Sequence, residues 1–83
     1  MTTLRDMAPG SDARVQSFSL GLQPEVSRRL RELGFGQGDL VRCLRVAPLG
    51  GPRVYAVSGA AFALEADLAE RVLVSLVESH DDG

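Results

Sequence analysis

Three short β patterns follow one another in DLVRCLRVAPLGGPRVYAVSGAAFAL, residues 39–64. The first of them, over residues 39–47, alternates with a period of two. It places Val41 and Cys43 on one face, and on the other face three further apolar residues, namely Leu40, Leu44 and Val46. Such alternation predicts a β-strand, and here both of its faces are partly apolar.

The segment 48–52, Pro-Leu-Gly-Gly-Pro, interrupts the β pattern with turn-forming residues at both ends. Residues 53–58 resume the pattern before Gly59, and residues 60–64 form a further short apolar run. These features predict two strands of a hairpin joined by a long loop, and then a third strand. The residues that we expect to shape these turns are Pro48, Gly50, Pro52 and Gly59.

Upstream of this run, residues 23–34 carry the signals of an amphipathic helix. Proline stands at the first helical position, an acidic residue follows in the first turn, and Val26, Leu30 and Leu33 recur at helical spacing. We predict a helix over residues 24–33 that ends at Gly34, which can adopt the left-handed conformation. Phe35 would then pack back on Leu30 as a staple at the helix end.

The remaining segments complete a mainly β chain. After a turn signal at residues 7–10, residues 13–20 are β-leaning; residues 65–70 can form one or two helical turns, and residues 71–78 resemble a last strand. The glycines at 36 and 38 indicate a turn, and we expect Gly38 to be one of the residues that shape it. So many short strands leave exposed sheet edges, which a small barrel removes.

We therefore predict a five-stranded SH3-like small barrel with one or two short helices. Its interior would hold the apolar residue of each inward position along the strands, with the apolar face of the helix closing one end. The predicted interior residues are Val15, Val41, Cys43, Tyr55, Val57, Leu64, Val72 and Val74.

A length of 83 residues fits one domain, which we place at residues 1–78, followed by an acidic tail at 79–83 that we expect to be disordered. The single cysteine excludes an internal disulfide and a cysteine-cluster metal site, and it suits a reducing compartment. No apolar run reaches the roughly 20 residues of a spanning helix, and residues 1–14 lack the apolar core of a signal peptide. We expect a cytoplasmic protein with no direct membrane insertion.

All nine basic residues are arginines, and the 11 acidic residues make the net charge −2. Without Asp81 and Asp82 of the tail, nine acids stand against nine bases. Nucleic-acid binders usually show a basic excess, because neutralised phosphates supply most of the affinity. The four aromatic residues are also too few for base stacking, so we expect no nucleic-acid partner.

The sequence lacks the residue sets of common catalytic sites. The only histidine, His80, lies in the polar tail, far from any nucleophile that it could serve as a base. The carboxylates of residues 65–70 are most simply solvated charges, and the glycines of 34–38 lack the Lys-Ser/Thr of a phosphate cradle. We predict that the chain is not an enzyme and has no cofactor.

Tight metal sites need several convergent histidine, cysteine or carboxylate ligands. This chain offers Cys43 on a strand, His80 in the tail and scattered acids. We interpret Cys43 as a small buried hydrophobe and predict no metal site.

Taken in order, several motifs resemble the FeoA family, small cytosolic accessories of bacterial ferrous-iron uptake. They are Met7-Ala8-Pro9-Gly10, the arginine-rich helix with its Gly34-Phe35-Gly36-Gln37-Gly38 ending, the loop Ala47-Pro48-Leu49-Gly50-Gly51-Pro52, Gly59, and Ala69 with Val72 and Val74. The resemblance covers about residues 4–76. It implies an SH3-like barrel without enzymatic activity, a family-level link to transition metal ions, and a FeoB-type permease with a cytosolic GTP-binding domain as partner.

One position departs from the pattern, since Glu65 stands where the family tends to have arginine, and the charge there is inverted. Similar barrels also form the C-terminal domain of iron-dependent repressors. A regulatory or nucleic-acid-binding module of that type is therefore the alternative function, although this chain lacks the attached DNA-binding helices. Capture of proline-rich peptides is disfavoured, because it needs clustered aromatic residues and the chain has no tryptophan.

An accessory protein that catalyses no reaction must act by binding a partner through its surface. The candidate partner-binding residues are Arg28, Arg29, Leu49 and Arg53. The helix arginines point to successive sides, so a solvated helix with an Arg28–Glu32 ion pair explains them equally well. Leu49 is either a lid over the barrel or an exposed apolar anchor. The residues also leave open a weak homo-oligomer.

Overall fold

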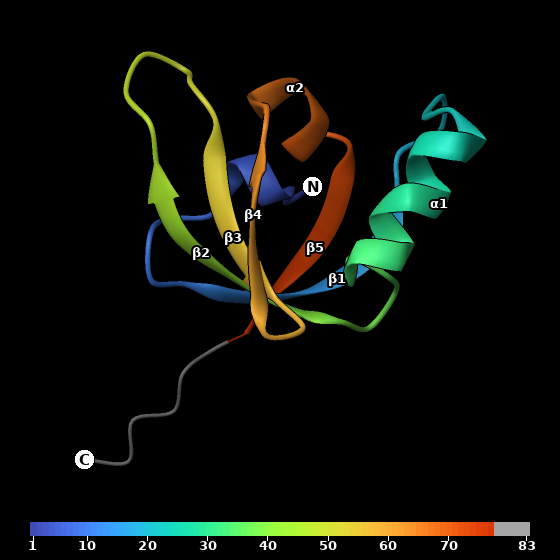
Figure 1. Cartoon of the computed structure of the whole chain (residues 1–83), viewed down its shortest axis with the longest axis horizontal. Helices are drawn as coiled ribbons and strands as arrows, with labels where there is room; N and C mark the ends of the chain where they lie inside the picture. Colours follow the sequence, from blue (N-terminus) through green and yellow to red (C-terminus); the bar gives the residue numbers. More distant parts are fainter. Residues whose placement is uncertain (78–83) are drawn as a thin grey trace.

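Five antiparallel strands form one sheet, in the order β4-β3-β2-β1-β5, in the computed structural model, which describes residues 1–77. The sheet curls into the small barrel that the sequence predicts (Figure 1). Its strands are β1 (Asp12–Phe18), β2 (Leu40–Val46), β3 (Arg53–Val57), β4 (Ala60–Leu64) and β5 (Val72–Val77). The helices are a 3₁₀ turn η1 (Leu4–Asp6), α1 (Pro24–Leu33) and a short α2 (Ala66–Ala69).

The strand pattern of the sequence is confirmed with small shifts at the ends. The first strand ends at Phe18 rather than residue 20, because the chain turns there: the Leu22 N–H donates to the Ser19 carbonyl over 3.3 Å, and Gly21 has a φ of 94°. The predicted acidic tail, residues 79–83, lies outside the described residues. None of the helices within residues 1–77 has the length and apolar character that crossing a membrane requires.

The end of α1 has the geometry of a Schellman motif. Gly34 has a φ of 115°, its N–H donates to the Arg31 carbonyl over 3.1 Å, and the Phe35 N–H donates to the Leu30 carbonyl over 2.9 Å. Phe35 is fully buried, and its ring meets those of Tyr55 and Phe62 edge-on at centroid distances of 6.4 and 6.1 Å. It is therefore a member of the barrel core as well as the residue that closes the helix end.

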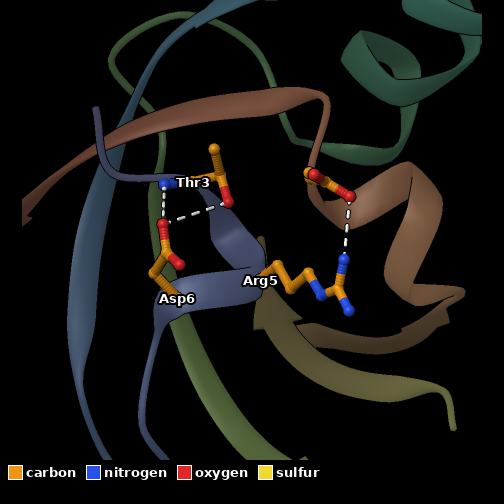
Figure 2. A network of polar contacts seen from close by, with 4 residues as sticks. Thr3, Arg5 and Asp6 are labelled. Carbon is orange, nitrogen blue, oxygen red and sulfur yellow. Dashed lines mark hydrogen bonds and ion pairs between the residues drawn. The ribbon is translucent and has the colours of Figure 1, made fainter. Parts of the chain in front are cut away.

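All eight residues predicted for the barrel interior are buried. The N-terminal segment also contributes to the core, which the sequence pattern did not indicate: Leu4 and Met7 have 0% and 1% of their surface exposed. Two hydrogen bonds hold this turn together (Figure 2). The N–H and the hydroxyl of Thr3 both donate to one carboxylate oxygen of Asp6, over 2.9 and 3.3 Å. Arg5 ties the turn to α2 through an ion pair of 2.8 Å with Glu70.

Candidate partner-binding surface

Helix α1 turns one face to the barrel and presents its arginines to solvent. Leu30 is buried and Val26 and Leu33 are half-buried against the core, so Arg28 and Arg29 lie on exposed positions. The Arg31 guanidinium lies 5.8 Å from the centre of the Phe18 ring, a cation–π arrangement that fixes this side chain on the barrel. Of the three helix arginines, the first two remain available to a partner.

The Arg28–Glu32 ion pair that the helix spacing predicts is not formed. The ion pairs among residues 1–77 are Arg5–Glu70 and Arg42–Asp12, the latter with an N–O distance of 2.7 Å. The surface charge of α1 is thus not neutralised by pairing along the helix.

The loop between β2 and β3 carries Leu49 at its tip, fully exposed. The Gly51 N–H donates to the Pro48 carbonyl over 3.2 Å, and the two central residues, Leu49 and Gly50, have φ values of 60° and 74°. This is the sign pattern of a type I′ turn, in which Asn, Asp and Gly are preferred and leucine is strained. The full exposure of Leu49 excludes the lid over the barrel, while its role as an apolar anchor for a partner stays a prediction.

The structure does not bring the arginines of α1 and Leu49 together. The β2–β3 loop projects from one end of the molecule and α1 stands at the other, along the longest axis (Figure 1). One compact patch on a partner therefore contacts one of these two features and not both.

Arg53, the fourth candidate, is directed inward. Its Nε donates to the Tyr55 hydroxyl oxygen over 2.9 Å and its Nη2 to the Met7 carbonyl over 2.6 Å, while the Tyr55 hydroxyl donates to the Leu4 carbonyl over 2.8 Å. Burial raises the pKa of Tyr55 to about 12, which keeps the phenol a donor. We therefore remove Arg53 from the partner-binding candidates and assign it to the fold.

Between α1, β4 and α2 lies a groove of about 350 Å³, called here the α1–β4 groove. Its lining is apolar apart from Arg29, the one charged side chain on it. The lining residues are Val26, Arg29, Leu30, Leu33, Phe62, Ala63, Leu64 and Leu68. Sequence reasoning missed this groove, although the charge-free composition of residues 60–64 was a signal of an unusual strand.

Glu65, at the position of inverted charge, is exposed and precedes α2 as its N-cap residue. Its carbonyl accepts hydrogen bonds from the N–H groups of Leu68 and Ala69 at 3.0 and 2.9 Å. The backbone of this residue thus starts the short helix. Glu65 does not line the groove, although its neighbour in sequence, Leu64, does.

The thiol of Cys43 is fully buried, and burial raises its pKa above the ordinary value. A thiol that stays protonated is a poor metal ligand. Within residues 1–77, no three histidine, cysteine, aspartate or glutamate side chains converge. His80 lies outside the described residues.

The sequence matches the family model of the FeoA domain over residues 2–76. Among solved structures, the chain is similar to a FeoA protein from Chlorobium tepidum, with 32% identity, a TM-score of 0.82, and coverage of 95% of this chain and 76% of that one. It is also similar to the zinc-complexed FeoA of Stenotrophomonas maltophilia, with 36% identity, a TM-score of 0.78, and coverage of 90% and 91%.

The Stenotrophomonas protein is described as a procaryotic SH3 domain protein and is suggested to be a ferrous iron transport activating factor. A manganese-dependent transcriptional repressor shares the fold at 20% identity and a TM-score of 0.79, covering 92% of this chain and 41% of the repressor. No curated protein matches the sequence.

Proposed function

The chain belongs to the FeoA family, and from that premise we propose that it is a non-enzymatic, cytoplasmic accessory of bacterial ferrous-iron uptake. It acts by binding the cytosolic GTP-binding part of a FeoB-type permease, and through that contact it supports or regulates transport. The observation that carries this proposal is the match over residues 2–76, which takes in nearly the whole described chain.

Two surface features support action by contact, because neither contributes to the core. Arg29 is exposed at the border of the α1–β4 groove, and Leu49 is exposed and strained at a loop tip. Interface energy concentrates in a few arginine and apolar anchors. A strained, exposed leucine costs folding free energy, which indicates a role outside folding.

No observation favours the repressor-like alternative. The likeness to the manganese-dependent repressor, at 20% identity, concerns the fold alone. The balance of nine arginines against 11 acids also gives no electrostatic basis for binding a phosphate backbone.

The test is a titration of the chain with the FeoB-type permease of the same genome in lipid nanodiscs. Because α1 and the Leu49 loop lie at opposite ends, Arg29→Glu and Leu49→Asp are measured separately, with circular dichroism as the fold control. Arg45→Glu and Leu20→Asp are the matched controls, since Arg45 and Leu20 are also exposed. We expect one of the two variants, Arg29→Glu or Leu49→Asp, to weaken binding at least roughly tenfold and the other to leave it unchanged.

Controls that bind like the wild type would support the proposal. No binding by the wild-type chain would refute it. Unchanged binding by both test variants would place the interface elsewhere, most plainly near Glu65. A companion measurement is radioactive ferrous-iron uptake in cells that lack this gene, which the wild-type chain should restore and a binding-deficient variant should not.

A further inference from the structure

Strand β4 is an edge of the sheet with one side unpaired. It pairs with β3 through a two-residue turn, Ser58-Gly59, which is flanked by the pair Val57↔Ala60. In such a hairpin the residue pair next to the turn is hydrogen-bonded, and hydrogen-bonded pairs then alternate with pairs that are not. The backbone groups of Ala60, Phe62 and Leu64 therefore bond to β3. The N–H and C=O groups of Ala61 and Ala63 therefore point away from β3, and they have no partner among residues 1–77.

The two edges of this sheet are treated differently. The N-terminal segment covers β5, because the Val74 N–H donates to the Thr2 carbonyl over 2.9 Å and Thr3 forms a bridge with Leu73. Strand β4 has none of the usual devices that block pairing: its sequence, Ala-Ala-Phe-Ala-Leu, contains neither charge nor proline, and its register with β3 has no bulge. The N-terminal segment thus covers the β5 edge of the sheet, whereas the β4 edge keeps backbone groups that are free to pair with another strand.

The unpaired edge of β4 borders the α1–β4 groove, so the groove determines which kind of segment can pair with this edge. A groove of about 350 Å³ with an apolar lining takes a single extended segment that has apolar side chains at alternate positions. Arg29, the one charged lining residue, favours a carboxylate on that segment. Phe62 is the sole aromatic residue of the lining, so a proline-rich ligand has no aromatic platform there.

We propose that β4 is a docking strand for an extended, apolar segment of the partner that carries one acidic residue. The segment adds to the sheet by pairing with Ala61 and Ala63, packs against Leu33 and Leu68, and places its carboxylate beside Arg29. This proposal rests on the proposed function, because it assigns the contact to a segment of the permease.

The experiment is hydrogen–deuterium exchange, read by mass spectrometry at residue resolution, on the wild-type chain alone and with the full-length permease in nanodiscs. We expect the Ala61 and Ala63 amides to exchange rapidly in the free chain and to become strongly protected in the complex. The Ala60 and Phe62 amides, which already bond to β3, should change far less. This alternation distinguishes strand pairing from a partner that merely covers the surface.

Two variants at one position test the same hydrogen bonds. Ala63→Pro removes an N–H that points away from β3, a change that edge strands tolerate, whereas Ala63→Ser keeps the backbone donor. We expect roughly tenfold weaker binding for Ala63→Pro, the value of about one good hydrogen bond, and little change for Ala63→Ser. If Ala63→Pro fails to fold, the wild-type exchange pattern and Arg29→Glu still decide the question.

The outcomes separate this proposal from the function on which it rests. A wild-type chain that does not bind the permease refutes the proposed function. Binding without protection of Ala61 and Ala63, or unaltered by Ala63→Pro, refutes the docking strand and leaves the function intact. Protection of these amides in the chain alone, rising with concentration together with a dimer in sedimentation, would assign the edge to a second copy and overturn the proposal.

Discussion

The Arg53 Nε donates a hydrogen bond of 2.9 Å to the hydroxyl oxygen of Tyr55, two residues further along β3. The two side chains act as one unit, since Arg53 also binds the Met7 carbonyl and Tyr55 the Leu4 carbonyl. In this way β3 holds the N-terminal segment, whose Leu4 and Met7 fill the core. An arginine that looked like a surface anchor in the sequence is thereby a structural residue.

This unit predicts how stability depends on alkaline pH. The pKa of Tyr55 is about 12 in the folded chain, against 10.0 for a free phenol, because burial disfavours the phenolate. Since the folded-state pKa is the higher one, stability is intact below pH 10 and falls as pH rises toward 12. The loss at full titration is about 3 kcal/mol, because each of the two pKa units corresponds to about 1.4 kcal/mol.

The measurement is chemical denaturation at several pH values between 9 and 12 for the wild-type residue and for Tyr55→Phe. Cys43 also has a raised pKa, so both proteins should carry Cys43→Ala, and the chain has no lysine to titrate in this range. Tyr55→Phe should lower stability at neutral pH by about 1–3 kcal/mol and flatten the alkaline slope. An equally steep slope in the phenylalanine variant would contradict the assignment.

Gly34→Val should be among the most destabilising glycine substitutions. A Cβ at Gly34 would lie 2.5 Å from Ser58 Oγ and 3.2 Å from Val57 Cγ2, at a φ of 115° that β-branched residues avoid. We expect a loss of about 3 kcal/mol or more, combining backbone strain and overpacking. An unchanged melting temperature would mean that the helix does not end as described.

Gly38→Val is the matched control for that prediction. Gly38 also has a positive φ, 87°, but no atom lies within 4 Å of its added Cβ. Only the strain should remain, at about 1–2 kcal/mol, as measured by thermal or chemical denaturation. Equal losses in the two variants would show that the contact with Ser58 adds nothing.

Leu49→Asn should separate folding from binding. Asparagine tolerates a positive φ better than leucine and is preferred in type I′ turns, so the variant should be more stable by about 0.5–1 kcal/mol. If Leu49 contacts the permease, the same variant should bind it more weakly. A variant that gains stability and keeps wild-type affinity would exclude Leu49 from the interface.

The chain should retain little iron. Protein incubated anaerobically with ferrous ion and then desalted should hold far less than one equivalent, because tight sites need several convergent ligands. Metal analysis of the desalted protein is the measurement. Stoichiometric retention that disappears in Cys43→Ala would instead make this buried thiol a ligand.

Elements with a complete local signal were predictable from the sequence. The bounds of α1 follow from a proline at its start and from Gly34 at its end, and the eight interior residues follow from alternation along the strands. The N-terminal contribution to the core had no such signal. A 3₁₀ turn of three residues is too short to show a period, so Leu4 and Met7 could not be assigned.

The candidate surface depended on long-range arrangement. Local sequence determined that Leu49 lies in a turn and that Arg29 lies on a helix, but not that the two stand at opposite ends of the molecule. Likewise, residues 60–64 formed a recognisable strand, yet the open side of β4 and the groove beside Arg29 exist only because of the strand order and the packing of α1. Backbone pattern is set by neighbours along the chain, whereas a surface is set by which distant segments fold side by side.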